Sequence, residues 1–155
     1  MMFFSGLAIG LMATSASAFS AIAPGDKLPV VDRQVPGYLE SQDALKEAGV
    51  DEVIVYCVND GAVMTAWGKD QGIDDSMVKF FGDPSGAFTK ALDMEMTHPG
   101  PASVGIIGRS KRFAMHIVDG EVKGVAIAES EFDPAGDDFP EKTLAPALIE
   151  MAKES

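Results

Sequence analysis

The spacing of apolar and polar residues switches repeatedly between a helical and a strand period from Ile22 onward. The stretches with a helical pattern are residues 38–48, 62–69, 87–92 and 144–152. The stretches with a strand pattern are residues 53–58, 77–81, 103–107, 112–118 and 122–126. Residues 129–141 hold six acidic residues and are predicted to form a solvated loop. This alternation predicts one α/β domain.

Three local signals predict how these elements connect. Residues 53–58 form a continuous apolar and β-branched run, which is typical of a parallel strand buried on both faces. Asn59 or Asp60 follows it and can cap the helix that comes next. Asp119-Gly120 lies between two strand patterns and predicts a tight antiparallel hairpin. A β-α-β half, a hairpin and a closing helix together make the thioredoxin-type plan.

Residues 1–18 contain no charged side chain, and residues 3–12 form an apolar run too short to span a bilayer as a helix. Small residues follow, as a signal peptidase requires. We therefore expect residues 1–18 to be a cleavable signal or targeting segment and residues 19–155 to form the domain. Ala16-Ser17-Ala18-Phe19 is similar to the cleavage motif of bipartite plastid presequences. It indicates a plastid (chloroplast) destination, with secretion as the alternative.

Charge and cysteine content narrow the functions that this domain can have. The net charge of -12 repels phosphate backbones, so nucleic-acid binding is not expected, and neither is membrane association once residues 1–18 are removed. One cysteine cannot form an internal disulfide, and two histidines without further thiols make a structural zinc site unexpected. No pattern predicts a cofactor, and the acidic loop lacks the spacing of a calcium loop.

Several sequence blocks occur in an order that is typical of one family. The blocks are Val35-Pro36-Gly37-Tyr38-Leu39-Glu40, Val58-Asn59-Asp60, Ala66-Trp67-Gly68, Gly82-Asp83-Pro84-Ser85-Gly86-Ala87-Phe88, Arg109-Ser110-Lys111-Arg112-Phe113-Ala114-Met115 and Val118-Asp119-Gly120-Glu121-Val122. Over residues 22–151 the chain resembles peroxiredoxin-5-like proteins, the type II or glutathione-dependent peroxiredoxins with a redoxin domain. The resemblance implies a thioredoxin-like fold and a thiol-dependent peroxidase that reduces hydrogen peroxide and alkyl hydroperoxides.

One part of the family pattern is absent. Pro24-Gly25-Asp26-Lys27-Leu28-Pro29 also fits the opening of the family's sequences. In the family, a strand and a Pro-x-x-x-Thr-x-x-Cys loop lie between this opening and the Pro-Gly-Tyr helix, whereas here Asp32-Arg33-Gln34 joins the two directly. The absent loop carries the cysteine that attacks peroxide and the threonine that helps to hold it. We therefore expect the chain as written to lack peroxidase activity, and we favour an exon omitted from the gene model as the cause.

The absent strand is central in the family, between residues 53–58 and the strands expected at 103–107 and 112–118. Unpaired buried backbone groups cost roughly 1 to 3 kcal/mol each, and a strand of them is comparable with the roughly 5 to 15 kcal/mol that stabilises a domain. Besides an omitted exon, three outcomes remain open. Another segment fills the slot, the two halves close up, or the chain does not fold stably.

Three residues are candidates for chemistry. Arg112 matches the family's active-site arginine, which stabilises the thiolate and the peroxide, and an ion pair at a surface or interface is the alternative. Cys57, the single thiol, stands at a family serine, and its apolar surroundings favour core packing over a role as nucleophile. His116 shares a strand face with Arg112 and is expected to be a packed, hydrogen-bonded histidine.

The resemblance also implies partners. Because no resolving cysteine precedes the last helix, the expected reductant of an active form is an external thiol donor such as glutathione, glutaredoxin or thioredoxin, and the expected assembly is a homodimer. A second hypothesis is a non-catalytic partner or regulatory subunit of an intact peroxiredoxin. A third is a single-cysteine enzyme that uses Cys57.

Overall fold

The structure is a computed structural model that describes residues 2–5, 31–130 and 138–154. Its strands are β1 (Met2–Ser5), β2 (Val53–Cys57), β3 (Val78–Gly82), β4 (Phe113–Val118) and β5 (Glu121–Ile127). Its helices are α1 (Val31–Glu40), α2 (Gln42–Glu47), α3 (Gly61–Gln71), α4 (Ala87–Ala91), α5 (Pro99–Ser103) and α6 (Ala145–Lys153), with a 3₁₀ turn, η1 (Pro140–Thr143). The expected α/β class is confirmed.

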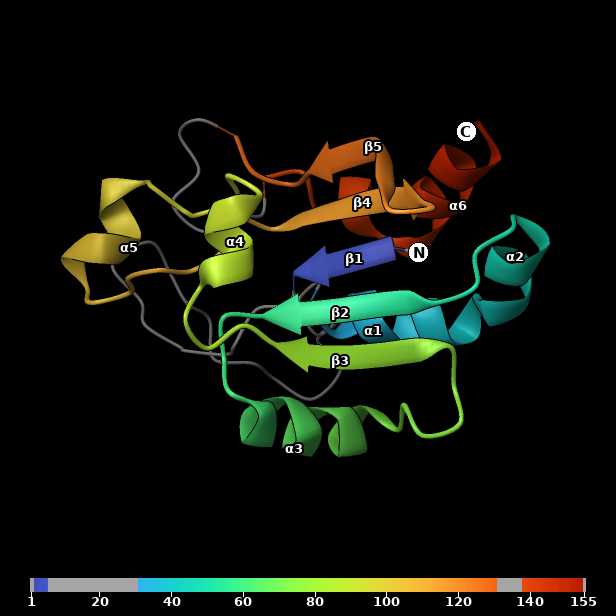
Figure 1. The fold of residues 1–155 in the computed structure, drawn as a ribbon, viewed down its shortest axis with the longest axis horizontal. Helices are drawn as coiled ribbons and strands as arrows, with labels where there is room; N and C mark the ends of the chain where they lie inside the picture. The colour runs from blue at the N-terminus through green and yellow to red at the C-terminus, as the bar shows by residue number, and fades with distance from the viewer. Residues whose placement is uncertain (1, 6–30, 131–137, 155) are drawn as a thin grey trace, which may run out of the picture.

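The strands form one five-stranded sheet in the order β3-β2-β1-β4-β5 (Figure 1). β1 and β3 run parallel to β2, whereas β4 runs antiparallel to β1 and to β5. The predicted hairpin at Asp119-Gly120 joins β4 to β5, and both of its residues have positive φ, as the tight turn requires.

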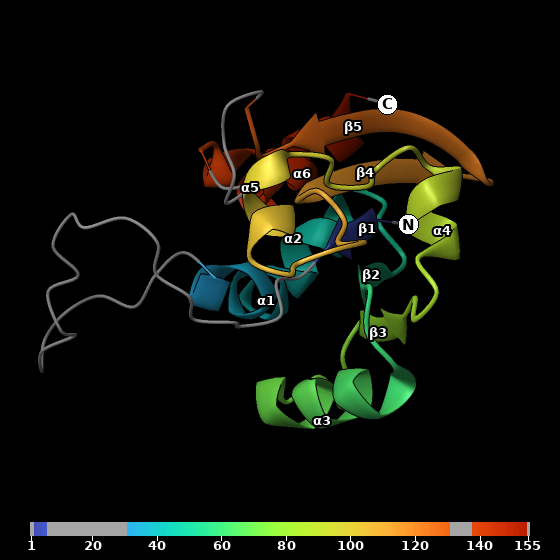
Figure 2. The ribbon, with the colours of Figure 1, turned by 90° about the vertical axis from the view of Figure 1, so that its left-hand side faces the viewer.

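Two layers of side chains cover the two faces of the sheet. Figure 2 shows α1, α2 and α6 on one side and α4 on the other. On the first side, Val53 and Val55 of β2 and Ala114 of β4 join a core that includes buried residues of α1 and α6, and we call this the α1/α6 face. On the second side, Tyr56 and Phe113 belong to a smaller cluster, and we call this the α4 face. The Tyr56 ring contacts Phe88 of α4 edge-on at 5.2 Å between centroids.

Local chemistry explains why the middle of the chain was predictable. Asp60, rather than Asn59, caps α3, because its Oδ1 accepts from the backbone N–H groups of Ala62 and Val63 at 2.9 Å each. Gly72 ends this helix in the left-handed conformation. The strands predicted at 53–58, 77–81, 112–118 and 122–126 and the helices predicted at 62–69, 87–92 and 144–152 are present with small changes of boundary.

The strand predicted at residues 103–107 is wrong. Pro99 instead opens α5 at a position where its missing N–H costs nothing, and His98 caps the helix. Gly105 then turns the chain with φ +83°, and Ile107 beyond it is 79% exposed. A β-branched run forms a strand only where a sheet edge accepts it, and β5 already pairs with the outer side of β4.

The helix predicted at residues 38–48 begins earlier and is broken into two. α1 extends back through Pro36 to Val31, and a turn at Ser41 separates it from α2. Val35 and Tyr38, one turn apart, are both buried in the core of the α1/α6 face. Packing of this face therefore extends the helix through Pro36 and Gly37, which are poor helix formers. In the acidic loop, residues 131–137 lie outside the described residues, and the end at 140–143 forms η1.

The central slot of the sheet, expected to be empty, is occupied. β1 lies between β2 and β4 (Figure 1). Met2 pairs with Val53 on one side and with His116 on the other. Of the outcomes that the sequence left open, the structure has another segment in the slot. That segment belongs to residues 1–18, whose expected role as a targeting segment stays a prediction.

Candidate functional site

Arg112 lies immediately before β4, and its carbonyl oxygen accepts a hydrogen bond from the N–H of Ala128 at 2.9 Å. Because side chains alternate along a strand, Arg112 points to the same side as Ala114, which is the α1/α6 face. Its side chain is only 5% exposed. The residue that matches the family arginine is therefore buried. Both interpretations of Arg112, the active-site arginine and the ion pair, stay predictions.

Cys57 ends β2 on the same face and is 2% exposed. Phe4 of β1 pairs with Val55 on one side and with Ala114 on the other, so these three positions form one row across the sheet. Two residues further along, Cys57 and Arg112 share the next row on the α1/α6 face. Two strand spacings separate their backbones by about 10 Å. The fold thus brings two of the three candidate residues into one row.

His116 is the third candidate and lies on β4, two pleats along from Arg112. It is buried, and this burial lowers its pKa because the charged imidazolium is disfavoured away from water. The strand face that His116 was expected to share with Arg112 stays a prediction, because Arg112 lies just outside β4.

A buried polar contact between α1 and η1 has no signal in the sequence. The hydroxyl of Tyr38 donates to the carbonyl oxygen of Thr143 at 3.0 Å, and Gln34 Nε2 donates to Thr143 Oγ1 at 3.4 Å. Burial raises the pKa of Tyr38 well above its usual value, which keeps the hydroxyl protonated as a donor. The partners are 105 and 109 residues apart in the chain, so no local pattern predicts them.

A second buried polar group, around Asp83, holds the start of α4. The Asp83 carboxylate accepts from the backbone N–H of Thr89 at 2.9 Å, from its Oγ1 at 2.8 Å and from the N–H of Phe88 at 3.3 Å. Burial opposes ionisation, but these hydrogen bonds prevail and lower the pKa of Asp83. Nearby, burial raises the pKa of Tyr56 to about 12. These groups orient α4 rather than supply a titrating residue at neutral pH.

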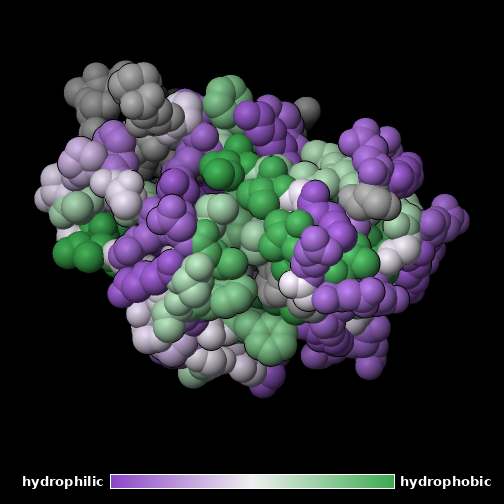
Figure 3. All heavy atoms as spheres, turned by 45° about the horizontal axis from the view of Figure 1, so that its top comes forward, coloured by the Kyte–Doolittle hydropathy of each residue, from purple (hydrophilic) through white to green (hydrophobic). Residues whose placement is uncertain are grey.

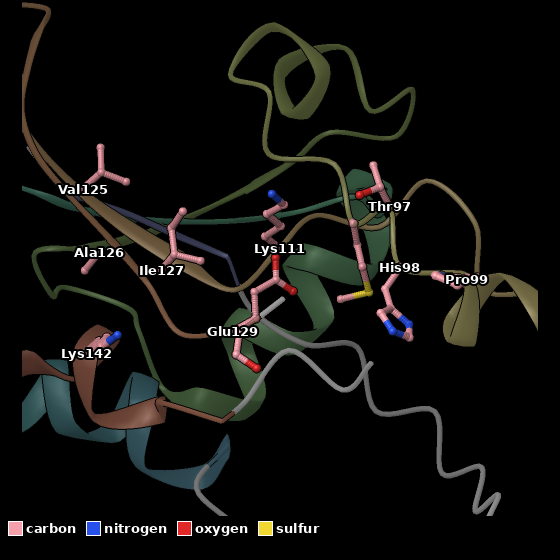
Figure 4. Close-up of a pocket in the computed structure, with 11 residues that line it drawn as sticks. Thr97, His98, Pro99, Lys111, Val125, Ala126, Ile127, Glu129 and Lys142 are labelled. Atoms are coloured by element: carbon pink, nitrogen blue, oxygen red, sulfur yellow. The ribbon is translucent and has the colours of Figure 1, made fainter. Parts of the chain in front are cut away.

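A hollow of about 920 Å³ lies beside the end of β5, between that strand, the segment before α5 and Lys142 of η1. Figure 4 shows Lys111 and Glu129 near its middle, with His98 and Lys142 toward opposite ends. His98 Nδ1 accepts from the N–H of Gly100 at 3.0 Å, so this nitrogen is engaged in capping α5. None of the three candidate residues is among those that line the hollow.

Exposed apolar side chains gather around Gly82 at the carboxyl ends of β2 and β3. They belong to Phe81 at the end of β3, Val63 near the start of α3 and Phe88 of α4, and Phe81 is 54% exposed. A Cβ at Gly82 would lie 3.3 Å from the nitrogen of Gly61, and Phe88 is hydrogen-bonded to Asp83, so the three segments adjoin. We call these three residues the Phe81 patch.

Exposed hydrophobic residues also occur outside the Phe81 patch. On the face that Figure 3 shows, hydrophobic residues lie in the middle, with hydrophilic residues on both sides. Val118, Val122 and Val125 of the β4–β5 hairpin are among the exposed ones. Across the described ranges, no group of three or more His, Cys, Asp or Glu residues could hold a metal ion, and no helix is long and apolar enough to cross a membrane.

Comparisons with known proteins identify the family of this chain. A family model described as Redoxin matches residues 16–141. "Peroxiredoxin-2B" of Arabidopsis thaliana is 41% identical over 108 residues, which cover 69% of this chain and 64% of that protein. "Peroxiredoxin-2E, chloroplastic" of the same plant is 36% identical over 108 residues, which cover 68% and 45%. The chain therefore spans about half to two-thirds of the length of these curated relatives.

Solved structures extend the likeness to almost the whole chain. Peroxiredoxin 5 from Alvinella pompejana is 26% identical with a TM-score of 0.65, and the match covers 99% of this chain and 79% of that one. Reduced Prx3 from Vibrio vulnificus in complex with H2O2 is 28% identical with a TM-score of 0.67, covering 98% and 76%. These matches confirm the expected thioredoxin-like fold. The chain belongs to the redoxin family, on its peroxiredoxin-5-like branch.

Proposed function

We propose that this chain descends from a thiol-dependent peroxidase of antioxidant defence and redox homeostasis and that its 155 residues do not turn over peroxide. The active form would reduce hydrogen peroxide and alkyl hydroperoxides, with glutathione, glutaredoxin or thioredoxin as donor. The family membership supports the ancestry. The burial of the single thiol supports the loss of turnover.

The burial of Cys57 carries the second half of this proposal. Peroxide reduction needs a thiolate that attacks one peroxide oxygen and becomes a sulfenic acid, and a second thiol must then reach that sulfur to reduce it. Cys57 is 2% exposed at the end of an entirely buried strand. Arg112 can stabilise a thiolate or a peroxide by its charge, but it has no electrons to give.

Peroxide consumption in the presence of glutathione and glutaredoxin tests the proposal. The purified chain and Cys57→Ser should both run at the background rate. An intact peroxiredoxin serves as the positive control for the donor system. Turnover by the chain that is lost in Cys57→Ser, together with peroxide-dependent sulfenic acid at Cys57, would establish the single-cysteine enzyme instead.

The messenger RNA tests the omitted segment directly. A transcript read across the codons of residues 32–35 should contain additional sequence that encodes the family's strand and cysteine loop. If these codons are contiguous in the messenger, the segment is absent from the protein itself.

A second candidate function, a regulatory subunit of an intact peroxiredoxin, is favoured by the Phe81 patch. Its three exposed apolar side chains lie on adjoining segments, and grouped exposed apolar residues are typical of protein-binding surfaces. The same patch supports the expected homodimer. In either assembly the chain would contribute a binding surface rather than a reactive thiol.

Association can be measured by sedimentation of the chain alone and mixed with an intact peroxiredoxin. Phe81→Asp should weaken whichever complex forms. Val125→Asp provides a matched control, because Val125 is also exposed, at 45%, but lies on β5. Equal effects of the two substitutions would count against the patch.

The plastid destination predicted from residues 1–18 is supported by the Ala16-Ser17-Ala18-Phe19 motif and by the chloroplastic name of one relative. Another relative, from Oryza sativa subsp. japonica, is named as mitochondrial. A fluorescent protein fused after Ser155 should enter plastids, and a fusion that begins at Phe19 should not. Secretion of the full fusion would favour the alternative.

A further inference from the structure

The residues expected to be removed as a targeting segment include the central strand of the sheet. β1 pairs with β2 from Met2–Val53 to Ser5–Tyr56 and with β4 from Met2–His116 to Phe4–Ala114. Each strand edge of β1 is therefore in use. Figure 1 shows β1 running in the same direction as β2 and opposite to β4.

The two strands beside β1 are the most buried strands for which burial is described. Every residue of β2 is buried, and so are the residues of β4 from Phe113 to Ile117. The outer strands differ, because only Val78 of β3 and no residue of β5 is buried to this extent. Without β1, the inner edges of β2 and β4 would leave buried N–H and C=O groups without partners, which native proteins avoid.

The pairing therefore conflicts with removal of the segment. We propose that Met2–Ser5 is an obligatory strand of the folded chain, so that cleavage after Ala18 and formation of this sheet exclude each other. A chain that is cut after Ala18 loses the strand that joins its β2–β3 part to its β4–β5 part. A chain that keeps residues 1–18 folds with Met2–Ser5 inside the sheet.

This conflict gives the segment two competing uses in a cell. As long as it is unfolded, its apolar residues can be read by a signal-recognition system. Once β1 is paired, Met2–Ser5 lie in the middle of the sheet, and the segment is no longer available to a translocation channel. Processing would therefore act as a switch that decides whether this sheet forms at all. The inference concerns the 155-residue chain, in which the family's central strand is absent, and it does not depend on peroxidase activity.

A truncation tests the requirement for β1. The full chain should show one cooperative thermal transition, with slow amide exchange in β2 and β4. The chain that begins at Phe19, with an initiating Met, should lose the transition and the protection of both strands. A synthetic peptide of residues 1–8 should restore part of this protection. If the truncated chain unfolds at the same temperature with both strands protected, the proposal is refuted.

Two single proline substitutions test the same proposal if the truncated chain cannot be purified. In the interior of a sheet each residue gives its N–H to a neighbouring strand, so Phe4→Pro should lower the melting temperature and increase exchange in β2 and β4. Ala21→Pro is the control, because it changes the same N-terminal part of the chain outside every described strand. Equal melting temperatures of the two variants would overturn the proposal.

A cross-link tests the register itself. In a Cys57→Ser background, Phe3→Cys with Met115→Cys should form a disulfide under mild oxidation, because these positions pair directly. Phe3→Cys with Val125→Cys is the matched control. Val125 pairs with Met115 on the far side of β4, about two strand spacings from Phe3, which is too far for a disulfide. Equal cross-linking of both pairs would show that β1 does not hold this position.

Discussion

The α1/α6 face and the hollow beside β5 carry different halves of what a peroxidase needs. The α1/α6 face holds Arg112, Cys57 and His116, which are all buried. The hollow of about 920 Å³ is lined by none of these three residues and by no thiol. The candidate reactive groups and the hollow are therefore separate. The comparison teaches that family ancestry can keep the fold and its arginine while the hollow is lined by other residues.

Truncation of large core side chains tests whether packing on both faces of the sheet contributes to the free energy of unfolding. Leu148→Ala on the α1/α6 side should lower the free energy of unfolding by about 2–5 kcal/mol, and Phe113→Ala on the α4 side by about 3–5 kcal/mol, because both side chains are fully buried. Val125→Ala should change it by less than about 0.5 kcal/mol. Chemical denaturation measures all three, and a loss below about 1 kcal/mol for either core variant would contradict this account.

Thiol labelling tests the closure of the α1/α6 face. In the native protein Cys57 should react with a soluble thiol reagent on the order of a thousandfold more slowly than a cysteine at Val125 in a Cys57→Ser background. Such protection corresponds to an opening free energy of about 4 kcal/mol. Both thiols should react alike in denaturant. Comparable native rates would show that the two faces do not differ in access.

Gly82, at the end of β3, lies close to the backbone that joins β2 to α3. A Cβ there would lie 2.6 Å from the carbonyl oxygen of Asn59 and 3.1 Å from the backbone carbon of Asp60. Gly82→Ala should therefore destabilise the protein by about 1–3 kcal/mol, as measured by thermal unfolding.

Gly37→Ala is the control for this substitution. Nothing lies within 4 Å of a Cβ at Gly37, and in a helix alanine is favoured over glycine by roughly 0.5–1 kcal/mol. The control should therefore be neutral or stabilising. If both variants behave alike, the close approach at Gly82 does not constrain the fold.

His116 should produce the smallest effect, as a pH dependence of the α1/α6 face. Burial lowers its pKa in the folded state, so below about pH 6.5 the unfolded chain binds a proton at this residue more readily than the folded chain. Stability from this residue is present above that pH and is lost as the pH falls through the folded-state pKa. His116→Gln should flatten the curve of unfolding free energy between pH 7 and pH 5. An unchanged slope would exclude His116 as its source.

Local signals predicted the part of the fold from β2 to α4 and the β4–β5 hairpin. Asp60 caps its helix and Asp119-Gly120 turns the hairpin through contacts within a few residues, so the sequence pattern contains them. The 103–107 strand failed because its β-branched residues have no free sheet edge to join. Whether such a run forms a strand depends on a pairing partner that is distant in the sequence.

The candidate site was predicted in part. The shared face of Arg112 and His116 is expected from strand alternation alone. The common row of Cys57 and Arg112 does not, because it depends on β1, whose apolar residues read equally well as a signal segment. The contact between Tyr38 and Thr143 depends on chain ends that only the tertiary fold brings together.

The position of β1 in the chain also sets an order of events during synthesis. Met2–Ser5 is translated before both of its partners, because β2 is complete only at residue 57 and β4 only at residue 118. β1 therefore has to wait for β4, and the sheet can close at its centre only after residue 118 has been made. During that interval the nascent apolar segment is available to chaperones and targeting factors. The speed of translation would therefore influence whether the segment is recognised for targeting or pairs as β1.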